Sequence, residues 1–398
     1  MKVKISRCTG QAFALAILLF LITASPARAQ EQPPELFTYA ELVQLYENKD
    51  LPDALQVKLD RLLTTPFISN AASARGVQPQ LPKTSKLGTF VRVVQWNIEE
   101  GTEYEAINAA FTDPARFAKL LESSAYPRGS QKRKEILQQV VLMKQADVIV
   151  LNEVDWGMKR TDYRNIAADL ATVLRMNYAY GVEFVEVDPI ALGIEEFEEV
   201  SAEDRMTLKT QIAVDKSRYL GLHGSAILSR FPLQNVRLQP FENQPHDWYK
   251  EELESVRSLE SGKRKAGELV FREKIERQVR RGGRMMLTAE IADQRIPSGR
   301  MTIVATHLED KTKPKGRREQ LKELLNRIRT TKTAVVVAGD MNTSTHDGTP
   351  LSLERALKNR FGSKSFWAKQ ALGILTGIKL PTLLLTGMIP IAHKLTQP

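Results

Sequence analysis

Hydrophobic runs of strand length alternate along most of the chain with apolar residues at helical spacing. Five such runs predict strands, at residues 90–96, 147–151, 178–187, 301–306 and 334–338. Apolar positions three and four residues apart predict helices, with faces Ile136, Leu137, Val140 and Val141; Ile166, Leu170, Val173 and Leu174; and Leu321, Leu324, Leu325 and Ile328. Strands that alternate with helices indicate an α/β or mixed-sheet domain.

The pattern of residues 30–86 predicts a helical N-terminal segment followed by a linker. Thr38, with Glu41 three positions later, has the pattern of a capping box at a helix start. A second apolar stripe follows at Leu55, Leu59, Leu62 and Leu63. Residues 70–86 are rich in Ala, Ser, Pro, Gln and Lys, which is typical of a linker.

The main domain is expected to span residues 87–398, with charged insertions near 189–218 and 245–281. Solvated helices are one interpretation of both insertions. The second insertion is followed by Gly282, Gly283 and Arg284. An alternative is therefore a rim that grips phosphate through arginine side chains.

The first residues have the pattern of a cleaved secretory signal, residues 1–29, with cleavage expected after Ala29. A membrane anchor is the alternative, although the apolar run 12–22 is shorter than a spanning helix needs. Cys8 is the only cysteine and would leave with the signal, so the mature chain would carry no disulfide. We expect a periplasmic or secreted protein.

Composition indicates a folded chain with a moderate positive charge. Apolar residues make up 42% of the 398 residues, which is enough to build a sizeable core and excludes disorder. The net charge of +10 would fall to +6 on loss of Lys2, Lys4, Arg7 and Arg28. This excess suits anionic substrates but does not establish nucleic-acid binding.

Polar groups able to handle a metal or a phosphate occur in five short segments, each beside or within a run of strand type. These segments are Gln95-Trp96-Asn97, Leu151-Asn152-Glu153, His223-Gly224-Ser225, Thr306-His307-Leu308 and Gly339-Asp340-Met341-Asn342. Asp340 and Asn342 are two residues apart, so in an extended chain both side chains point to one face. That spacing favours a shared target.

Together the five segments resemble the endonuclease/exonuclease/phosphatase superfamily, which has the deoxyribonuclease-I-like fold. The resemblance covers roughly residues 89–350, and the segments occur in the family's order. It implies an α/β (α+β) fold in which two packed mixed β-sheets, flanked by helices, form a four-layer sandwich. It also implies a phosphate-ester substrate, with nucleic acid as one candidate.

Glu153, at the mouth of a buried strand, is expected to be the principal ligand of Mg²⁺ or Mn²⁺, which favour carboxylate and water. Asn97 would offer its amide oxygen to the metal or hold Glu153 by a hydrogen bond. One of Glu99 and Glu100 is a further candidate ligand, although exposed loop acids are the commoner outcome. A divalent cation would neutralise charge on the phosphate oxygens.

Three residues are expected to act in catalysis. Asp340 would orient or deprotonate the attacking water, and the amide of Asn342 would donate to a phosphoryl oxygen. His307, in the position of the family's His-Leu pair, would hydrogen-bond the phosphate or assist the leaving group.

Substrate contacts are expected from His223, Ser225 and Arg284. Ser225 stands where the family tends to have Asn, which is a departure from its pattern. His246 and His346 could reach the site from loops.

The chain also lacks the Ser-Asp-His run that usually ends the family's last strand. We expect the sequence to stop before its last strands, because a sheet without them would expose apolar edges. The alternatives are that another histidine takes the role, or that the protein does not catalyse.

The apolar tail, residues 371–392, is broken by Lys379, Pro381 and Pro390, so a spanning helix is disfavoured. A loop and helix packed on the domain is expected, and peripheral membrane contact is the alternative.

These observations predict an exported, Mg²⁺-dependent phosphoesterase that hydrolyses phosphodiester bonds by attack of water. A phospholipid or sugar-phosphate hydrolase on the same fold is one alternative. A catalytically inactive secreted binding protein is the other. The patterns do not choose among DNA, RNA, lipid and small esters, because substrate choice depends on loops around a shared site.

Overall fold

The computed structural model describes residues 32–86, 88–121, 126–187, 189, 192–194, 214–254, 279–296 and 298–343. The described residues from Pro34 onward form one compact unit. The expected signal segment, the expected domain start at residue 87, His346 and the apolar tail lie outside the described residues, as does most of each insertion.

The larger sheet runs in the order β1, β6, β7, β5 and β4, and β9 also pairs with β6. Its only parallel pair is β4 with β5, and all its other pairs are antiparallel. The strands are β1 (Phe67–Ser69), β4 (Val93–Asn97), β5 (Val148–Trp156), β6 (Asn177–Glu186), β7 (Leu222–Ser229) and β9 (Arg280–Gly282).

The second sheet has the order β12, β11, β10 and β8. Here β11 and β12 are parallel, and the other two pairs are antiparallel. The strands are β8 (Gln234–Pro240), β10 (Met285–Ala292), β11 (Arg300–His307) and β12 (Ala334–Asp340). A small hairpin is formed by β2 (Lys83–Thr84) and β3 (Gly88–Thr89).

Apolar side chains from both sheets meet in a common core. Val148 and Val150 of β5 share this core with Leu287 of β10 and Ile303 of β11. Alternate residues of a strand point to opposite faces, so the intervening Ile149 belongs to a different cluster, under the helices. Complete burial of one such side chain stabilises the fold by roughly 1.5–3 kcal/mol.

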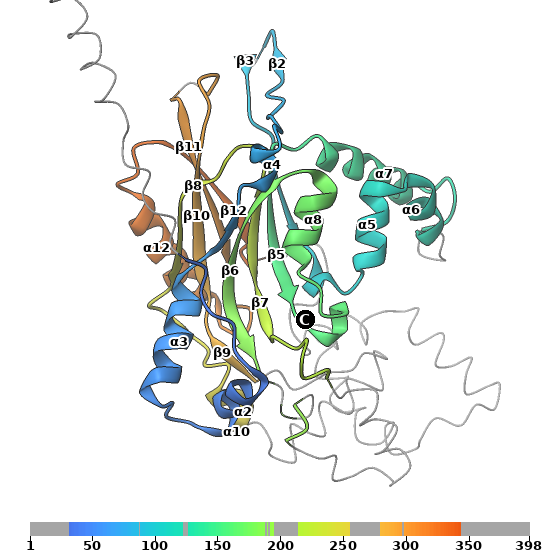
Figure 1. Ribbon diagram of the computed structural model, residues 1–398. Coiled ribbons are helices and arrows are strands. Elements are labelled where there is room, and N and C mark those ends of the chain that lie inside the picture. The colour runs from blue at the N-terminus through green and yellow to red at the C-terminus, as the bar shows by residue number, and fades with distance from the viewer. Residues whose placement is uncertain are drawn as a thin grey trace, which may run out of the picture. The chain divides into compact units, whose positions relative to one another are not determined.

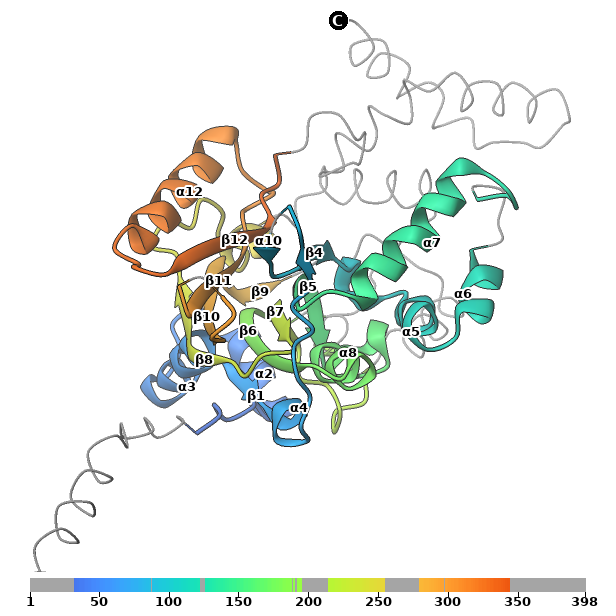
Figure 2. The same cartoon turned by 90° about the horizontal axis from the view of Figure 1, so that it is seen from above.

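Helices cover the outer face of each sheet. Leu42, Leu62 and Leu170, from three of the helices, pack against the larger sheet, and Leu324 packs with Val304 and Val337 on the second sheet. Figures 1 and 2 show α12 outside β11 and β12, with α5 and α8 on the opposite side of the molecule. The predicted four-layer sandwich is therefore confirmed.

The helices are α2 (Tyr39–Glu47), α3 (Asp53–Thr64), α4 (Ala71–Ala74), α5 (Tyr104–Thr112), α6 (Pro114–Leu120), α7 (Gln131–Lys144), α8 (Ile166–Leu174), α10 (Lys250–Glu254) and α12 (Pro314–Ile328). Short 3₁₀ turns occur at η1 (Glu99–Gly101) and η2 (Lys159–Thr161). No helix in the described part of the chain is long and apolar enough to span a bilayer.

The predicted strands and helices are present, with shifts at their ends. The capping box of Thr38 and Glu41 is formed at the start of α2. The predicted apolar faces of two helices included one exposed residue each, Val141 of α7 and Leu325 of α12. Both side chains lie beside an apolar residue that does pack, and the spacing alone did not separate them.

Residues 70–86 were expected to be a linker, and the structure corrects this. Asn70 makes hydrogen bonds in both directions with the backbone of Leu233, and Ala72 of α4 is buried. Ser73 is hydrogen-bonded to Asn177 of β6. The polar residues that suggested a linker instead attach this segment to the larger sheet.

Candidate active site

The ends of β4 and β12 meet the middle of β5, at Glu153, although the three strands lie far apart in the sequence. Nδ2 of Asn97 donates to Oε1 of Glu153 at 2.8 Å and to Oδ2 of Asp340 at 3.0 Å. Parallel pairing explains the meeting, since Asn97 is in register with the residue before Glu153, and Asp340 with His307. Two carboxylates from different sheets thus share one amide nitrogen.

Glu153 has an unusual backbone conformation. Its φ of 55° is left-handed, and the pairing of β5 with β7 shifts register between Leu151 and Val154, which flank it. Such a conformation costs a non-glycine residue roughly 1–3 kcal/mol and is concentrated at functional sites. Leu151 and Val154 are buried, whereas 27% of the Glu153 side chain remains exposed. The bulge therefore presents one carboxylate to solvent from a buried strand.

Burial raises the pKa of Glu153 to about 7, and the hydrogen bond from Asn97 opposes this shift. The neighbouring carboxylate of Glu100 raises the pKa further. A carboxylate with a pKa near neutrality readily exchanges its proton for a cation.

Both carboxylate oxygens of Asp340 are fixed by hydrogen bonds. Oδ2 accepts from Asn97, and Oδ1 accepts from the backbone N–H of Asn342 at 2.8 Å. The side-chain amide of Asn342 donates to the backbone oxygen of Leu308 at 2.7 Å. The predicted donation from Asn342 to a phosphoryl oxygen stays a prediction.

His307 is 2% exposed and lies between Glu153 and a buried ion-pair cluster. Burial, with a further contribution from Arg284, holds the pKa of His307 well below its usual value, so the ring is neutral. Nη1 of Arg284 lies 2.8 Å from Nδ1 of His307, and a guanidinium can only donate. Nδ1 is therefore the acceptor, and the proton is on Nε2, which lies 3.9 Å from Oε1 of Glu153.

Arg284 is buried among acids. Its Nη1 is 2.9 Å from Glu183, its Nη2 is 3.0 Å from Asp310, and its Nε is 3.4 Å from Glu309. Burial alone would lower the pKa of Arg284, but Glu309 and Glu183 raise it above its usual value. The side chain is only 3% exposed, so it supports His307 from behind, and direct contact with substrate stays a prediction.

Ser225 and Glu183 form the layer beneath this group. The hydroxyl of Ser225 donates to Oε1 of Glu183 at 2.5 Å, and both residues are fully buried. The sequence analysis did not select Glu183. The available signal was an acid inside an apolar strand, since such an acid is almost never fully buried without a partner.

His223 is 2% exposed, and its Nδ1 lies 2.9 Å from Oδ1 of Asp155. Burial lowers the pKa of His223 to about 3, with a contribution from Arg280. Burial also raises the pKa of Asp155 to about 6, against the opposing charge of Arg160. The expected substrate contact of His223 stays a prediction, because the ring lies beneath the surface.

Two arginines join this buried pair to the turn that follows β4. Arg160 contacts Asp155, Glu186 and Glu100 at 2.6, 2.7 and 2.9 Å. Arg280 contacts Glu186 at 3.0 Å and Glu100 at 3.3 Å. Burial alone would raise the pKa of Glu186, but the two arginines hold it at about 2. Glu100, a candidate metal ligand from its sequence position, is thus paired with the side chains of two arginines.

Nδ1 of His246 is 2.9 Å from Glu251, and its ring meets the ring of Trp248 edge-on at 5.1 Å. The indole N–H of Trp248 donates to Glu309, which lies beside Arg284. Direct contact of His246 with the site stays a prediction.

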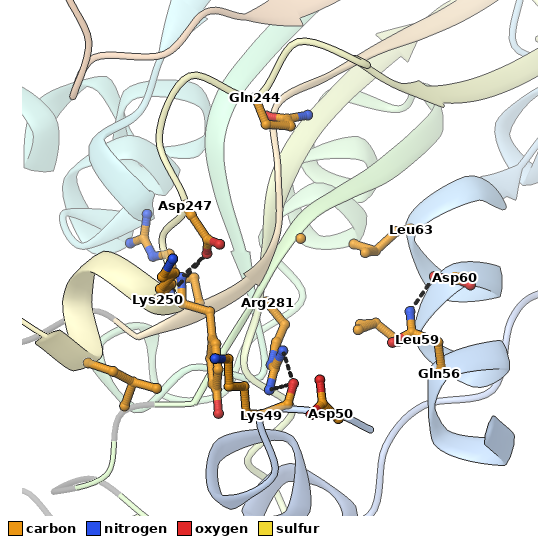
Figure 3. A pocket seen from close by; sticks show the side chains of 14 residues that line it. Lys49, Asp50, Gln56, Leu59, Asp60, Leu63, Gln244, Asp247, Lys250 and Arg281 are labelled. Atoms are coloured by element: carbon orange, nitrogen blue, oxygen red, sulfur yellow. Dashed lines mark hydrogen bonds between the residues drawn. The ribbon is translucent and has the colours of Figure 1, made fainter. Parts of the chain in front are cut away.

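A separate cavity of about 610 Å³ lies between α3, β9 and the start of α10. Figure 3 shows Leu59 and Leu63 on one side and Lys250 and Arg281 on the other. The guanidinium of Arg281 donates to the backbone oxygen of Leu45 at 3.0 Å and covers the ring of Tyr249. Asn97, Glu153 and Asp340 do not line this cavity, so it is distinct from the site between the sheets.

The residues at the meeting of β4, β5 and β12 fit a hard divalent cation. Within the described ranges, no group of three or more His, Cys, Asp or Glu side chains is arranged to hold a metal. Mg²⁺, however, is commonly held by one or two carboxylates and keeps several waters. Glu153 and Asp340 supply two such carboxylates. Nδ2 of Asn97 holds both carboxylates, and its Oδ1 accepts from the backbone N–H of Glu99. The expected contact of this oxygen with the metal stays a prediction.

The sequence model of the endonuclease/exonuclease/phosphatase family matches residues 94–379. The chain belongs to this family. The match includes the residues predicted for metal binding, catalysis and substrate contact, which are Asn97, Glu153, His223, Ser225, Arg284, His307, Asp340 and Asn342.

Several solved structures are similar to the chain, and two of them follow. An endonuclease/exonuclease/phosphatase from Beutenbergia cavernae DSM 12333 is 18% identical with a TM-score of 0.33, over 68% of this chain and 54% of that one. ANGEL2, a 2',3'-cyclic phosphatase, is 15% identical with a TM-score of 0.29, over 64% of this chain and 54% of that one. The chain thus spans about half the length of each. No curated protein matches it.

Proposed function

We propose that the protein is an exported, divalent-metal-dependent phosphoesterase that cleaves phosphodiester bonds by direct attack of water. The observation that carries the proposal is the amide of Asn97, which holds the carboxylates of Glu153 and Asp340 together beside His307. Family membership supports the reaction class, since the family's name covers nucleases and phosphatases.

Each residue of this group has a chemical task in such a reaction. Asp340, held at both oxygens, is the base that orients the attacking water. Neutral His307 carries a proton on Nε2 and donates it toward a phosphoryl or leaving-group oxygen. Glu153 and Asp340 would hold Mg²⁺ or Mn²⁺, which, when bound, neutralises charge on the phosphate oxygens.

The test is turnover of purified protein on bis-p-nitrophenyl phosphate, plasmid DNA, RNA and phospholipid vesicles, with Mg²⁺ and with EDTA. Glu153→Gln and Asp340→Asn remove one charge each and keep the shape. We expect each to lower kcat by at least about 10²-fold.

Matched controls are Glu290→Gln and Asp293→Asn, because both acids lie on the second sheet or beside it and pair with surface arginines. Equal activity of Glu153→Gln and Glu290→Gln on every substrate would overturn the site. Turnover that persists unchanged in EDTA would overturn the metal dependence.

Export is proposed from the sequence alone. N-terminal sequencing of protein recovered outside the cytoplasm should begin at Gln30. Recovery of the intact N-terminus would reject this part of the proposal without affecting the rest.

A further inference from the structure

Asn152 makes side-chain contacts with both sheets. It is fully buried, and its Oδ1 accepts from the backbone N–H of Asp340 at 2.9 Å and from Gln95 at 3.1 Å. Its Nδ2 donates to Oγ of Ser225 and to the backbone oxygen of Thr306, both at 2.9 Å. A primary amide has two donor hydrogens and two acceptor lone pairs, so every hydrogen-bonding position of Asn152 is used.

The four partners come from four strands. Gln95 is in β4 and Ser225 in β7 of the larger sheet, whereas Thr306 is in β11 and Asp340 in β12 of the second. Asn152 itself is in β5, directly before Glu153. Thr306 pairs with Gly339 between β11 and β12. The two hydrogen bonds from Asn152 to the second sheet therefore hold β11 and β12 at neighbouring positions along the strands.

We propose that Asn152 is a positioning residue that sets the distance between the carboxylates of Glu153 and Asp340. Its backbone continues into Glu153, and its side chain fixes the backbone of Asp340. Other hydrogen bonds at the site depend on this placement, since Asn97 must reach both carboxylates at once. The catalytic consequence rests on the proposed function, whereas the positioning of Asp340 does not.

An apolar side chain of similar size at position 152 could not make these hydrogen bonds or fix the backbone of Asp340. Leucine at position 152 would remove the hydrogen bonds of Asn152 to the N–H of Asp340 and to the backbone oxygen of Thr306. A buried polar group that loses a hydrogen bond shifts to regain one, because an unpaired buried polar group is unfavourable. β12 should therefore move away from β5 at its end, where the two carboxylates meet.

Asn177 provides a matched control. It is also a buried asparagine of the larger sheet, and it donates to Ser73, Ser229 and Phe231 while it accepts from Ser73. None of these partners belongs to the site. Asn177→Leu should therefore lower stability as Asn152→Leu does, without moving Asp340.

The experiment compares Asn152→Leu with Asn177→Leu in three measurements on the full chain. These are the melting temperature, amide hydrogen exchange at Asp340 by NMR, and kcat and KM on bis-p-nitrophenyl phosphate with Mg²⁺. We expect faster exchange at Asp340 only in Asn152→Leu, with kcat lower by about 10- to 100-fold and KM little changed. Asn177→Leu should keep wild-type exchange at Asp340 and wild-type kcat.

If either leucine variant fails to fold, Asn152→Gln and Asn177→Gln replace the pair, since they keep the amide and change only its reach. The proposal is overturned if exchange at Asp340 is unchanged in the position-152 variant, or if kcat falls equally in both variants. If the wild type has no turnover, the proposed function fails, and the exchange comparison still decides whether Asn152 positions Asp340.

Discussion

Arg284 fixes the proton of His307, because Nη1 of the arginine lies 2.8 Å from Nδ1 of the ring and can only donate to it. Glu183, Glu309 and Asp310 hold the guanidinium in place. The cluster therefore sets which nitrogen of His307 faces Glu153, although Arg284 itself is buried.

Arg284→Lys should disturb this arrangement while it keeps the charge. An ammonium group is a single point and cannot serve three acids and a ring nitrogen in one plane. We expect kcat to fall roughly 10- to 100-fold. The ¹⁵N NMR signals of His307 should change from a single Nε2–H form to a mixture.

Arg281→Lys is the control, because Arg281 is a half-buried arginine three residues before Arg284 that binds the carbonyl end of α2. It should leave His307 and kcat unchanged. A single Nε2–H form of His307 in Arg284→Lys would contradict the assignment.

Mg²⁺ binding should weaken as the pH falls below 7. Glu153 has a pKa of about 7, so below that pH the cation must displace a proton. We expect the apparent Kd, measured by calorimetry, to rise about tenfold for each pH unit below 7. Glu153→Gln should bind Mg²⁺ weakly and with no such slope.

The same carboxyl should affect stability in the opposite direction when no metal is present. Between its ordinary pKa of 4.5 and its folded value of about 7, the folded chain holds a proton that the unfolded chain has released. The contribution of Glu153 to stability is therefore lost as the pH rises through this window. Urea unfolding in EDTA should show a smaller loss over this window in Glu153→Gln.

His223 should make the fold sensitive to acid. Its folded pKa of about 3 lies below the ordinary 6.5, so between these values only the unfolded chain takes up the proton. Stability is therefore lost as the pH falls below 6.5. Asp155, with a raised pKa of about 6, offsets part of this loss. In urea unfolding from pH 7.5 to 4.5, His223→Gln should lose less stability than wild type, and equal losses would contradict the prediction.

Gly339→Ala should damage the site through the backbone. Gly339 has φ of 154°, and a Cβ there would lie 1.8 Å from the backbone oxygen of Thr306. β12 must then move away from β11 just before Asp340. We expect the free energy of unfolding to fall by roughly 1–3 kcal/mol and Mg²⁺ binding to weaken.

The control is Gly129→Ala. Gly129 also has positive φ, but nothing lies within 4 Å of a Cβ at this position. It should cost about 1 kcal/mol from backbone strain and leave Mg²⁺ binding unchanged. An equal change in metal binding would show that the clash at Thr306 has no effect on the site.

Apolar periodicity predicted the strands and helices, because it reports which face of an element is buried. The four layers were expected from the family resemblance. The sequence also predicted Glu153 and Asp340, since an acid that interrupts or ends an apolar strand requires a partner. A hydrogen bond from Asn97 to Glu153 was one of the two roles expected for Asn97, whereas its bond to Asp340 was not predicted. The order of residues along a chain does not say which strand ends meet. Pairing of β4 with β5 and of β11 with β12 supplies that information.

Glu183, Glu186 and Arg160 were not predicted for a different reason. The two acids lie among apolar residues in β6, and the sequence alone does not distinguish a solvated acid from a buried one that is paired with an arginine. Arg160 is on a short turn, where a basic residue is usually exposed. Only the fold shows that it pairs with Asp155, Glu186 and Glu100 together.

The division of the two carboxylates between the sheets gives any ligand that bridges them a mechanical effect. Such a ligand would link the two sheets where they meet, and it would oppose their separation in addition to any role in the reaction. Saturation with Mg²⁺ should therefore slow unfolding of the whole sandwich, and not only of the strand ends that bind it.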